Sequence, residues 1–241
     1  MKRVLINIDC GENFSIYKNP NEEELIKYGD LINIACGFHS GDPDSIRETV
    51  KLVKKYNKLP GAHPSYPDLV GFGRRSMKLT QKEIENIIIY QIGALSGFLK
   101  VEGLTLNHVK PHGALYNDSI KDEKVAQAIG NGVIIFDRNL ILIGLSNSKQ
   151  VEIWKEMGLK VLSEVYIDRG YNDDGTLVPR SEKDSVIDDL NLIEKRIKNL
   201  LNYGEIESIN GKKIKIPFDT ICLHSDTPSS LKILKLLREY I

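Results

Sequence analysis

Short apolar runs alternate with longer amphipathic stretches along the whole chain. The apolar runs predict strands over residues 3–9, 31–37, 59–63, 104–110, 140–145, 160–167 and 220–225. Between them, apolar positions recur at helical spacing over residues 43–57, 80–102, 120–131, 147–157, 182–203 and 228–240. Near-continuous apolar strands separated by helices are typical of a parallel sheet covered by helices.

The number of these units predicts the architecture. Seven strand–helix units indicate a single α/β domain over residues 1–241, built as a seven-stranded, TIM-like β/α barrel. A doubly wound open sheet is the alternative, because periodicity alone cannot show that a sheet closes. One segment interrupts the alternation: residues 205–216 place Asn-Gly between two alternating runs, which predicts a small β-hairpin.

Composition excludes some classes of partner. Lys plus Arg and Asp plus Glu number 33 each in 241 residues, so the sequence gives no support for a nucleic-acid or anionic-membrane partner. The cysteines, Cys10, Cys36 and Cys222, form no CxxC pair and are expected to be buried thiols. The chain starts without a signal-peptide pattern, and no apolar run approaches the length of a membrane span. We therefore expect a cytoplasmic protein.

Polar residues gather where the predicted strands end. The active site of a β/α barrel lies at the C-terminal ends of its strands. All five histidines lie at such ends: His39, His63, His108, His112 and His224. The other polar candidates there are Asp9, Glu12, Arg74, Arg75, Lys110, Glu164, Asp168, Arg169 and Asp226. This placement predicts a polar site at one mouth of the barrel.

The residue types suggest roles for these side chains. Candidates for catalysis are Asp9, Glu12, His63, His108, Lys110 and His112. Candidates for substrate binding are His39, Arg74, Arg75, Asp168, Arg169, His224 and Asp226. If a divalent metal is bound, Asp9, His63 and His108 are the candidate ligands.

Structural alternatives stay open for several of these candidates. Lys110 can act as a base with a lowered pKa, hold an anion, or form a structural ion pair with Asp9 or Glu12. One of Arg74 and Arg75 is expected to be a surface or ion-pairing residue. Asp226 is equally well placed to cap the last helix.

Several long motifs resemble one known family. They are "INIACGFHSGDP", "GAHPSYPDLVGFGRR", "YQIGAL", "HVKPHGALYN", "DRGYNDDGTLVPR" and "ICLHSDTP". Together they resemble the LamB/YcsF family from the first strand to the last helix. Asn13, Ser40 and Ser225 depart from the usual family pattern, with Ser225 standing where glycine is usual.

The resemblance implies a fold and a function. The implied fold is a seven-stranded barrel of the glycoside hydrolase/deacetylase type. The implied function is that of the A subunit of a 5-oxoprolinase, which opens the lactam of 5-oxoproline to glutamate with ATP hydrolysis, together with B and C subunits. ATP with Mg²⁺ is the implied cofactor. No Walker motif is present, and "GFGRR" lacks a phosphate-loop context, so partners are expected to supply or share the ATP site.

Two other functions remain open. Relatives of the implied fold hold a divalent metal with one Asp and two His, so the resemblance leaves open a stand-alone metal-dependent deacetylase or amide hydrolase that would use Asp9 and two histidines. A non-catalytic subunit would bind a carbohydrate or another small ligand. The sequence also leaves open whether the chain forms a homo-oligomer.

Overall fold

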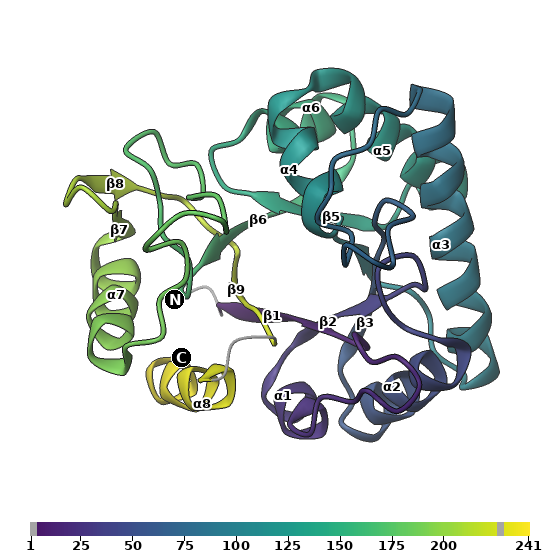
Figure 1. The fold of residues 1–241 in the computed structure, drawn as a ribbon, viewed down its shortest axis with the longest axis horizontal. Coiled ribbons are helices and arrows are strands. Elements are labelled where there is room, and N and C mark those ends of the chain that lie inside the picture. The colour runs from purple at the N-terminus through teal and green to yellow at the C-terminus, as the bar shows by residue number, and fades with distance from the viewer. Residues whose placement is uncertain (1–3, 226–228) are drawn as a thin grey trace.

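Seven parallel strands close into a barrel. The computed structural model describes residues 4–225 and 229–241. The strands follow the order β1 (Leu5–Cys10), β2 (Leu31–Ala35), β3 (Leu59–His63), β4 (His108–Val109), β5 (Ile141–Leu145), β6 (Lys160–Tyr166) and β9 (Thr220–Leu223) (Figure 1). Because β9 pairs with both β1 and β6, the barrel is closed. This confirms the predicted barrel and excludes the open sheet.

Helices surround the barrel (Figure 1). They are α1 (Glu22–Tyr28), α2 (Pro43–Lys55), α3 (Gln81–Val101), α4 (Gly113–Lys121), α5 (Glu123–Asp137), α6 (Lys149–Glu156), α7 (Leu190–Tyr203) and α8 (Ser230–Tyr240). The sequence sets their starts clearly in two cases. The Asp42 side chain accepts hydrogen bonds from the backbone at the start of α2, and Thr80 with Glu83 forms a capping box at the start of α3.

The two faces of a strand carry different chemistry. Successive side chains of a strand point to opposite faces. On β1, Asn7 and Asp9 face the barrel interior, where both accept hydrogen bonds from Lys110. Ile6 and Ile8 alternate with them and are fully buried. The sequence of β1 therefore looks like an apolar run, although the inner face of the strand is polar.

The hairpin was predicted correctly. Strands β7 (Glu205–Glu207) and β8 (Lys213–Lys215) pair antiparallel beside the barrel (Figure 1). Gly211 in the turn has a φ of 82°, which glycine adopts without steric cost.

Other segments differ from the prediction. Helices α1 and α4 were not expected, and the stretch predicted as one helix over 120–131 divides between the end of α4 and the first part of α5. The strand predicted over 104–110 shrinks to β4, because only His108 and Val109 pair with β3 and β5. The helix predicted from residue 182 begins at Leu190. The preceding loop is held by isolated bridges, Arg169 with Val186 and Tyr171 with Leu177.

Helix α3 contradicts the expectation that no apolar run approaches the length of a membrane span. Its 21 residues are apolar enough to cross a membrane by length and composition, which is weak evidence by itself. Ile84, Ile88, Ile92 and Leu95 on this helix are buried in the common core.

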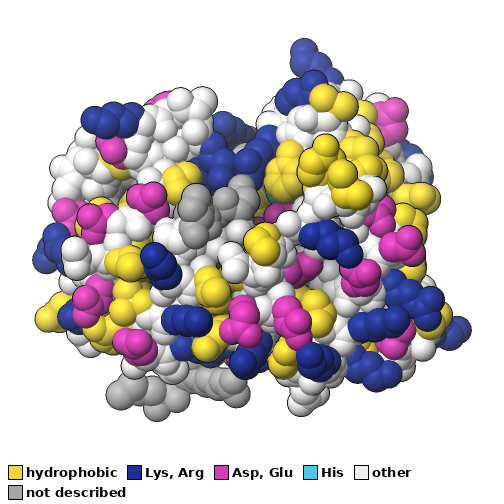
Figure 2. All heavy atoms as spheres, turned by 60° about the horizontal axis from the view of Figure 1, so that its bottom comes forward, with side chains coloured by type: hydrophobic (Ala, Val, Ile, Leu, Met, Phe, Trp, Pro, Cys, Tyr) yellow, Lys and Arg dark blue, Asp and Glu magenta, His cyan; other side chains and the backbone are white. Residues whose placement is uncertain are grey.

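Acidic and basic side chains are interspersed on the face of the molecule that Figure 2 shows, in keeping with the zero net charge.

Candidate active site

A buried lysine lies at the centre of the barrel mouth. Lys110 directly follows β4, and its Nζ lies 3.0 Å from Asp9 Oδ1 and 3.2 Å from Glu164 Oε2. The same ammonium donates to Asn7 Oδ1 at 3.1 Å and to Cys222 Sγ at 2.9 Å. Burial would lower the pKa of Lys110, but its anionic neighbours, Asp9 first, hold that pKa well above its ordinary value. Lys110 is therefore a fixed cation rather than a base.

Asp9 is an ionised carboxylate that several donors orient. Its Oδ1 accepts from Lys110 and, at 2.8 Å, from Asn33 Nδ2, while its Oδ2 lies 3.4 Å from His63 Nε2. Burial would raise the pKa of Asp9, yet His63 and Lys110 hold it well below its ordinary value. The ion pair anticipated as a structural alternative thus exists, and it borders a pocket at this mouth.

Three histidines and a glutamate converge next to this pair. Glu12, His39, His63 and His112 each place a ligand atom within 4.8 Å of the others. Glu12, His39 and His112 follow β1, β2 and β4, and His63 is the last residue of β3, so four consecutive strand ends build the cluster. The rings of His39 and His112 stack with centroids 3.8 Å apart. Burial lowers the pKa of both rings well below the ordinary histidine value, so both are neutral at pH 7.

Backbone carbonyls fix two of these rings. His63 Nδ1 lies 2.6 Å from the Lys110 carbonyl oxygen, and His112 Nε2 lies 2.9 Å from the Phe72 carbonyl oxygen. The loop that carries Phe72 is in turn tied to α4, because Gly73 accepts a hydrogen bond from Ala114 N. Phe72 itself has a φ of 53°, a conformation that non-glycine residues rarely adopt.

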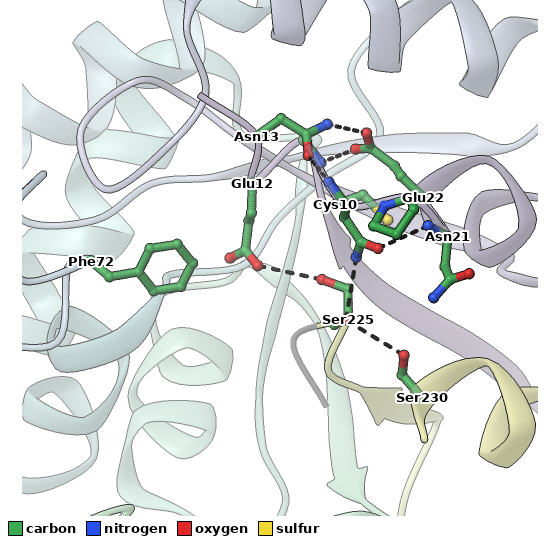
Figure 3. Close-up of a pocket in the computed structure, with 11 residues that line it drawn as sticks. Cys10, Glu12, Asn13, Asn21, Glu22, Phe72, Ser225 and Ser230 are labelled. Carbon is green, nitrogen blue, oxygen red and sulfur yellow. Dashed lines mark hydrogen bonds between the residues drawn. The ribbon is translucent and has the colours of Figure 1, made fainter. Parts of the chain in front are cut away.

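A second carboxylate, Glu22, shapes the loop that carries Glu12. Glu22 is buried and accepts hydrogen bonds from Gly11 N, the Asn13 side chain and Thr49 Oγ1. Burial raises the pKa of Glu22. Figure 3 shows Glu12 turned away from Glu22 toward Phe72 and Ser225. Asn13, one of the departures from the family pattern, is thus a structural link in this loop.

Ser225, the departure that replaces a usual glycine, contacts the same site. Its hydroxyl lies 3.5 Å from Glu12 Oε2, and its carbonyl accepts from Asn19 Nδ2 (Figure 3). These groups border a cavity of about 390 Å³. Ser40, the third departure, donates to the Asn13 carbonyl oxygen at 3.3 Å.

A pocket at the mouth has a volume of about 610 Å³. Its polar lining includes Asp9, His63, Lys110, His112, Tyr166 and His224, and its basic lining adds Arg74, Lys121, Arg169 and Arg180. His224 Nδ1 lies 3.0 Å from Asp168 Oδ2, and the His224 ring stacks on Tyr166. The pocket therefore combines a buried ion pair, an Asp–His pair and several cations.

Three predicted site residues have structural contacts that set them apart from the rest of the site. His108 lies deeper in the barrel, where its Nε2 contacts Asn33 Oδ1 at 2.8 Å, so Asp9, His63 and His108 do not form the expected metal set. Arg75 pairs with Asp68 and is largely exposed, which is the outcome expected for one of the two arginines. Arg169 donates to the carbonyls of residues 185 and 178 and so holds the neighbouring loop, although it lines the pocket. Asp226 lies outside the described residues.

Several residues of the site were missed by sequence reasoning. They are Asn7, Asn33, Tyr166 and Cys222, whose side chains face the buried centre, and Glu22. A signal existed for two of them. "LINID" and "LINIA" each place an asparagine in the middle of an apolar strand, where a polar side chain requires a buried partner.

Comparison with known proteins shows which family the chain belongs to and which proteins it is similar to. The model of the LamB/YcsF family matches residues 4–241. The chain belongs to the LamB/YcsF family. The A subunit of 5-oxoprolinase from Pyrococcus abyssi is 52% identical over 99% of this chain and 94% of that protein, and the Campylobacter jejuni protein of the same name is 46% identical over the same shares. The crystal structure of the lactam utilization protein from Thermus thermophilus superposes with a TM-score of 0.92 at 40% identity, covering 100% of this chain and 96% of that one.

Proposed function

We propose that this chain is the A subunit of a 5-oxoprolinase, which opens the lactam of 5-oxoproline to L-glutamate with hydrolysis of ATP. One observation carries the proposal. The buried Lys110–Asp9–Glu164 centre borders a ligand-sized pocket in a chain that is 52% identical, over nearly its whole length, to a protein named as the A subunit of 5-oxoprolinase. The word subunit in that name supports partner chains, which we infer to be the B and C subunits.

Lactam opening needs an activated carbonyl, since an amide is stable near neutral pH. In the proposed reaction the γ-phosphoryl group of ATP moves to the lactam oxygen as its bond to ADP breaks. Water then adds to the lactam carbon and loses a proton, the C–N bond breaks, and the ring nitrogen takes up a proton. A second water releases phosphate from the acyl phosphate. One 5-oxoproline, one ATP and two waters thus give glutamate, ADP and phosphate.

The residues around the pocket match these demands. The Lys110 ammonium provides fixed positive charge for the lactam oxygen, where negative charge develops. Asp9, held ionised beside it, accepts a proton from the attacking water. The Asp168–His224 pair delivers a proton to the ring nitrogen, because Asp168 orients the imidazole on the pocket wall.

The same pocket offers groups for a nucleotide. Arg74, Lys121 and Arg180 line it and supply cations for phosphate or for the substrate carboxylate. Asp174 also lines it, and a carboxylate is a ligand of the kind that Mg²⁺ takes. A nucleotide site shared with a partner subunit fits the absence of a Walker motif from the sequence.

A second candidate function is favoured by a different observation. The convergence of Glu12, His39, His63 and His112 is suited to a stand-alone metal-dependent amide hydrolase. That enzyme would act on its substrate without ATP and without partners, so the two functions make opposite predictions.

Glutamate formation from 5-oxoproline tests the proposal. The full chain is assayed alone and with its B and C partners, in each case with and without Mg-ATP. We expect turnover only in the complete mixture with Mg-ATP, with one ADP formed per glutamate. Turnover by the chain alone without ATP would establish the second candidate instead. No turnover by folded, co-purified partners with Mg-ATP would contradict the proposed function.

A further inference from the structure

We propose that Glu12, His39, His63 and His112 bind one divalent transition-metal ion, with zinc as the preferred ion. All four side chains are buried or nearly so, and their ligand atoms lie within 4.8 Å of one another. The inference goes beyond the proposed function, because the chemistry of lactam opening with ATP does not require this ion.

The hydrogen bonds of two rings leave lone pairs facing each other. A carbonyl oxygen only accepts, so His63 Nδ1 carries a proton toward the Lys110 carbonyl, and His112 Nε2 carries one toward the Phe72 carbonyl. In a neutral ring the other nitrogen is then an acceptor. Those two acceptors, His63 Nε2 and His112 Nδ1, lie only 3.1 Å apart. Two bare acceptors at this distance repel each other, and either a proton on His63 Nε2, which also lies 3.4 Å from Asp9 Oδ2, or a metal ion beside both nitrogens removes the repulsion.

A carboxylate adds a further acceptor at the same point. Glu12 Oε1 lies 3.4 Å from His112 Nδ1 and 3.3 Å from His39 Nε2. The stacked, nearly parallel rings of His39 and His112 favour neutral imidazoles, since two protonated rings in that geometry would repel each other. The unprotonated nitrogen of a neutral imidazole and a carboxylate oxygen are both acceptors, and both are ligands that zinc takes.

The spacing of the ligand atoms suits a tetrahedral ion. Zn²⁺ bonds to nitrogen and oxygen at about 2.0–2.2 Å, which places the ligand atoms of a tetrahedron about 3.4 Å apart. Three of the six separations in this cluster, 3.1, 3.3 and 3.4 Å, agree with that edge length, and all six lie within 4.8 Å. Three imidazoles and one carboxylate favour zinc and its neighbours in the first transition row over Mg²⁺, which prefers oxygen ligands in an octahedron.

The surroundings orient two of the ligand rings, His63 and His112, before an ion binds. The carbonyls of Lys110 and Phe72 accept from the outer nitrogens of two rings, and metal-binding histidines usually donate their other ring N–H in this way. A bound ion would supply Lewis acidity at the wall of the pocket that His63 and His112 line. Asp9 adjoins the cluster through His63, and Lys110 holds its other oxygen.

Metal binding to the full chain tests this site directly. The purified chain is stripped with a chelator and titrated with Co²⁺, which is followed by visible absorption, and with Zn²⁺, which is followed by competition and metal analysis. We expect one ion per chain and the intense visible bands of tetrahedral Co²⁺. Binding of Mg²⁺ alone, or of less than about a tenth of an equivalent of Co²⁺ and Zn²⁺, would overturn the proposal.

Matched variants locate the ion. His112→Gln and Glu12→Gln remove one ligand each, and we expect each to weaken Co²⁺ binding by more than ~100-fold, the upper end for loss of an outer-shell partner. His224→Gln removes a histidine of the same mouth that lies outside the cluster, and it should keep one ion per chain. Circular dichroism shows which variants are folded. Unchanged affinity in both folded ligand variants would contradict the assignment.

The metal readout is independent of turnover. A chain that forms glutamate with ATP and partners but binds no transition metal would disprove the site and leave the proposed function standing. A chain that binds one ion yet gives no glutamate with its partners would support the metal site and contradict the proposed function.

Discussion

At the residue scale, Lys110 has the largest expected influence on both stability and activity. Its removal leaves Asp9 and Glu164 as buried carboxylates without a cation, so we predict that Lys110→Met lowers the free energy of unfolding by about 3–5 kcal/mol. Turnover of 5-oxoproline by the complex should fall by at least ~100-fold, because the charge that faces the lactam oxygen is lost. Urea unfolding and a glutamate assay measure the two effects.

The control for this prediction is a lysine on the surface. Lys149 forms an exposed ion pair with Glu123, and such pairs contribute little. Lys149→Met should therefore leave unfolding and turnover nearly unchanged. If Lys110→Met proved as stable and active as Lys149→Met, the buried ion pair would have neither role.

His108 should make stability depend on pH. Burial first, and then the nearby Lys110, lower its pKa to about 3, whereas the unfolded chain has the ordinary value of 6.5. Below pH 6.5 the unfolded chain binds the proton and the folded chain does not, so stability falls as pH falls through this window. The contribution lost between pH 7.5 and pH 5 is about 2 kcal/mol.

A substitution isolates this contribution. His108→Gln cannot titrate, so its free energy of unfolding should decline less than that of the wild type between pH 7.5 and pH 5, by about 2 kcal/mol. Urea unfolding with chelator present at each pH gives the comparison. Parallel pH profiles for the two proteins would show that His108 is not kept neutral by the fold.

The sequence could predict which residue types reach the mouth, but not their depth. Lys110, His63 and His112 lie where a strand end should deliver them, and all three line the pocket. His108 is only two residues before Lys110 and also faces inward, yet it lies beneath the pocket against Asn33. Depth depends on the stagger between neighbouring strands, which is a property of the closed barrel and not of one strand's periodicity.

At the scale of elements, one glycine permits two strands to share the barrel interior. Gly61 on β3 pairs in register with His108 on β4, and a Cβ at Gly61 would collide with the His108 ring. We predict that Gly61→Ala destabilises the protein by about 1–3 kcal/mol through overpacking. Gly97→Ala on α3 meets no neighbour within 4 Å and should stabilise by up to ~1 kcal/mol, because alanine favours a helix. Effects of equal sign in urea unfolding would contradict this account.

Local signals explain which elements could be predicted. The Asn-Gly turn of the hairpin, the Asp42 cap and the Thr80 capping box all act within a few residues, and each marks the element it predicts. Helix α4 has no side-chain cap at His112, and its first residue is a glycine, so its start carries no such signal. Strand β4 is short because its pairing partners, distant in sequence, decide its length.

At the scale of the whole molecule, closure joins the two ends of the chain. The first strand pairs with the last, so every barrel strand has two neighbours and the sheet has no free edge. The site depends on this closure, because Lys110 from β4 meets Asp9 from β1, Glu164 from β6 and Cys222 from β9 across the interior. Loss of one strand would therefore open the ring and separate these groups.

Because the barrel is closed, we predict that a destabilising substitution in one strand lowers the stability of the whole ring. Ile32 on β2 is fully buried, and Ile32→Ala should lower the free energy of unfolding by about 2–5 kcal/mol. The single tryptophan, Trp154, lies on α6 near β5, away from β2 in the barrel order. If the ring unfolds as one unit, Trp154 fluorescence and far-ultraviolet circular dichroism should shift to the same lower urea midpoint. The control Ile16→Ala, at an exposed side chain, should shift neither. A fluorescence midpoint that stayed at the wild-type value while circular dichroism moved would show that the two halves unfold separately.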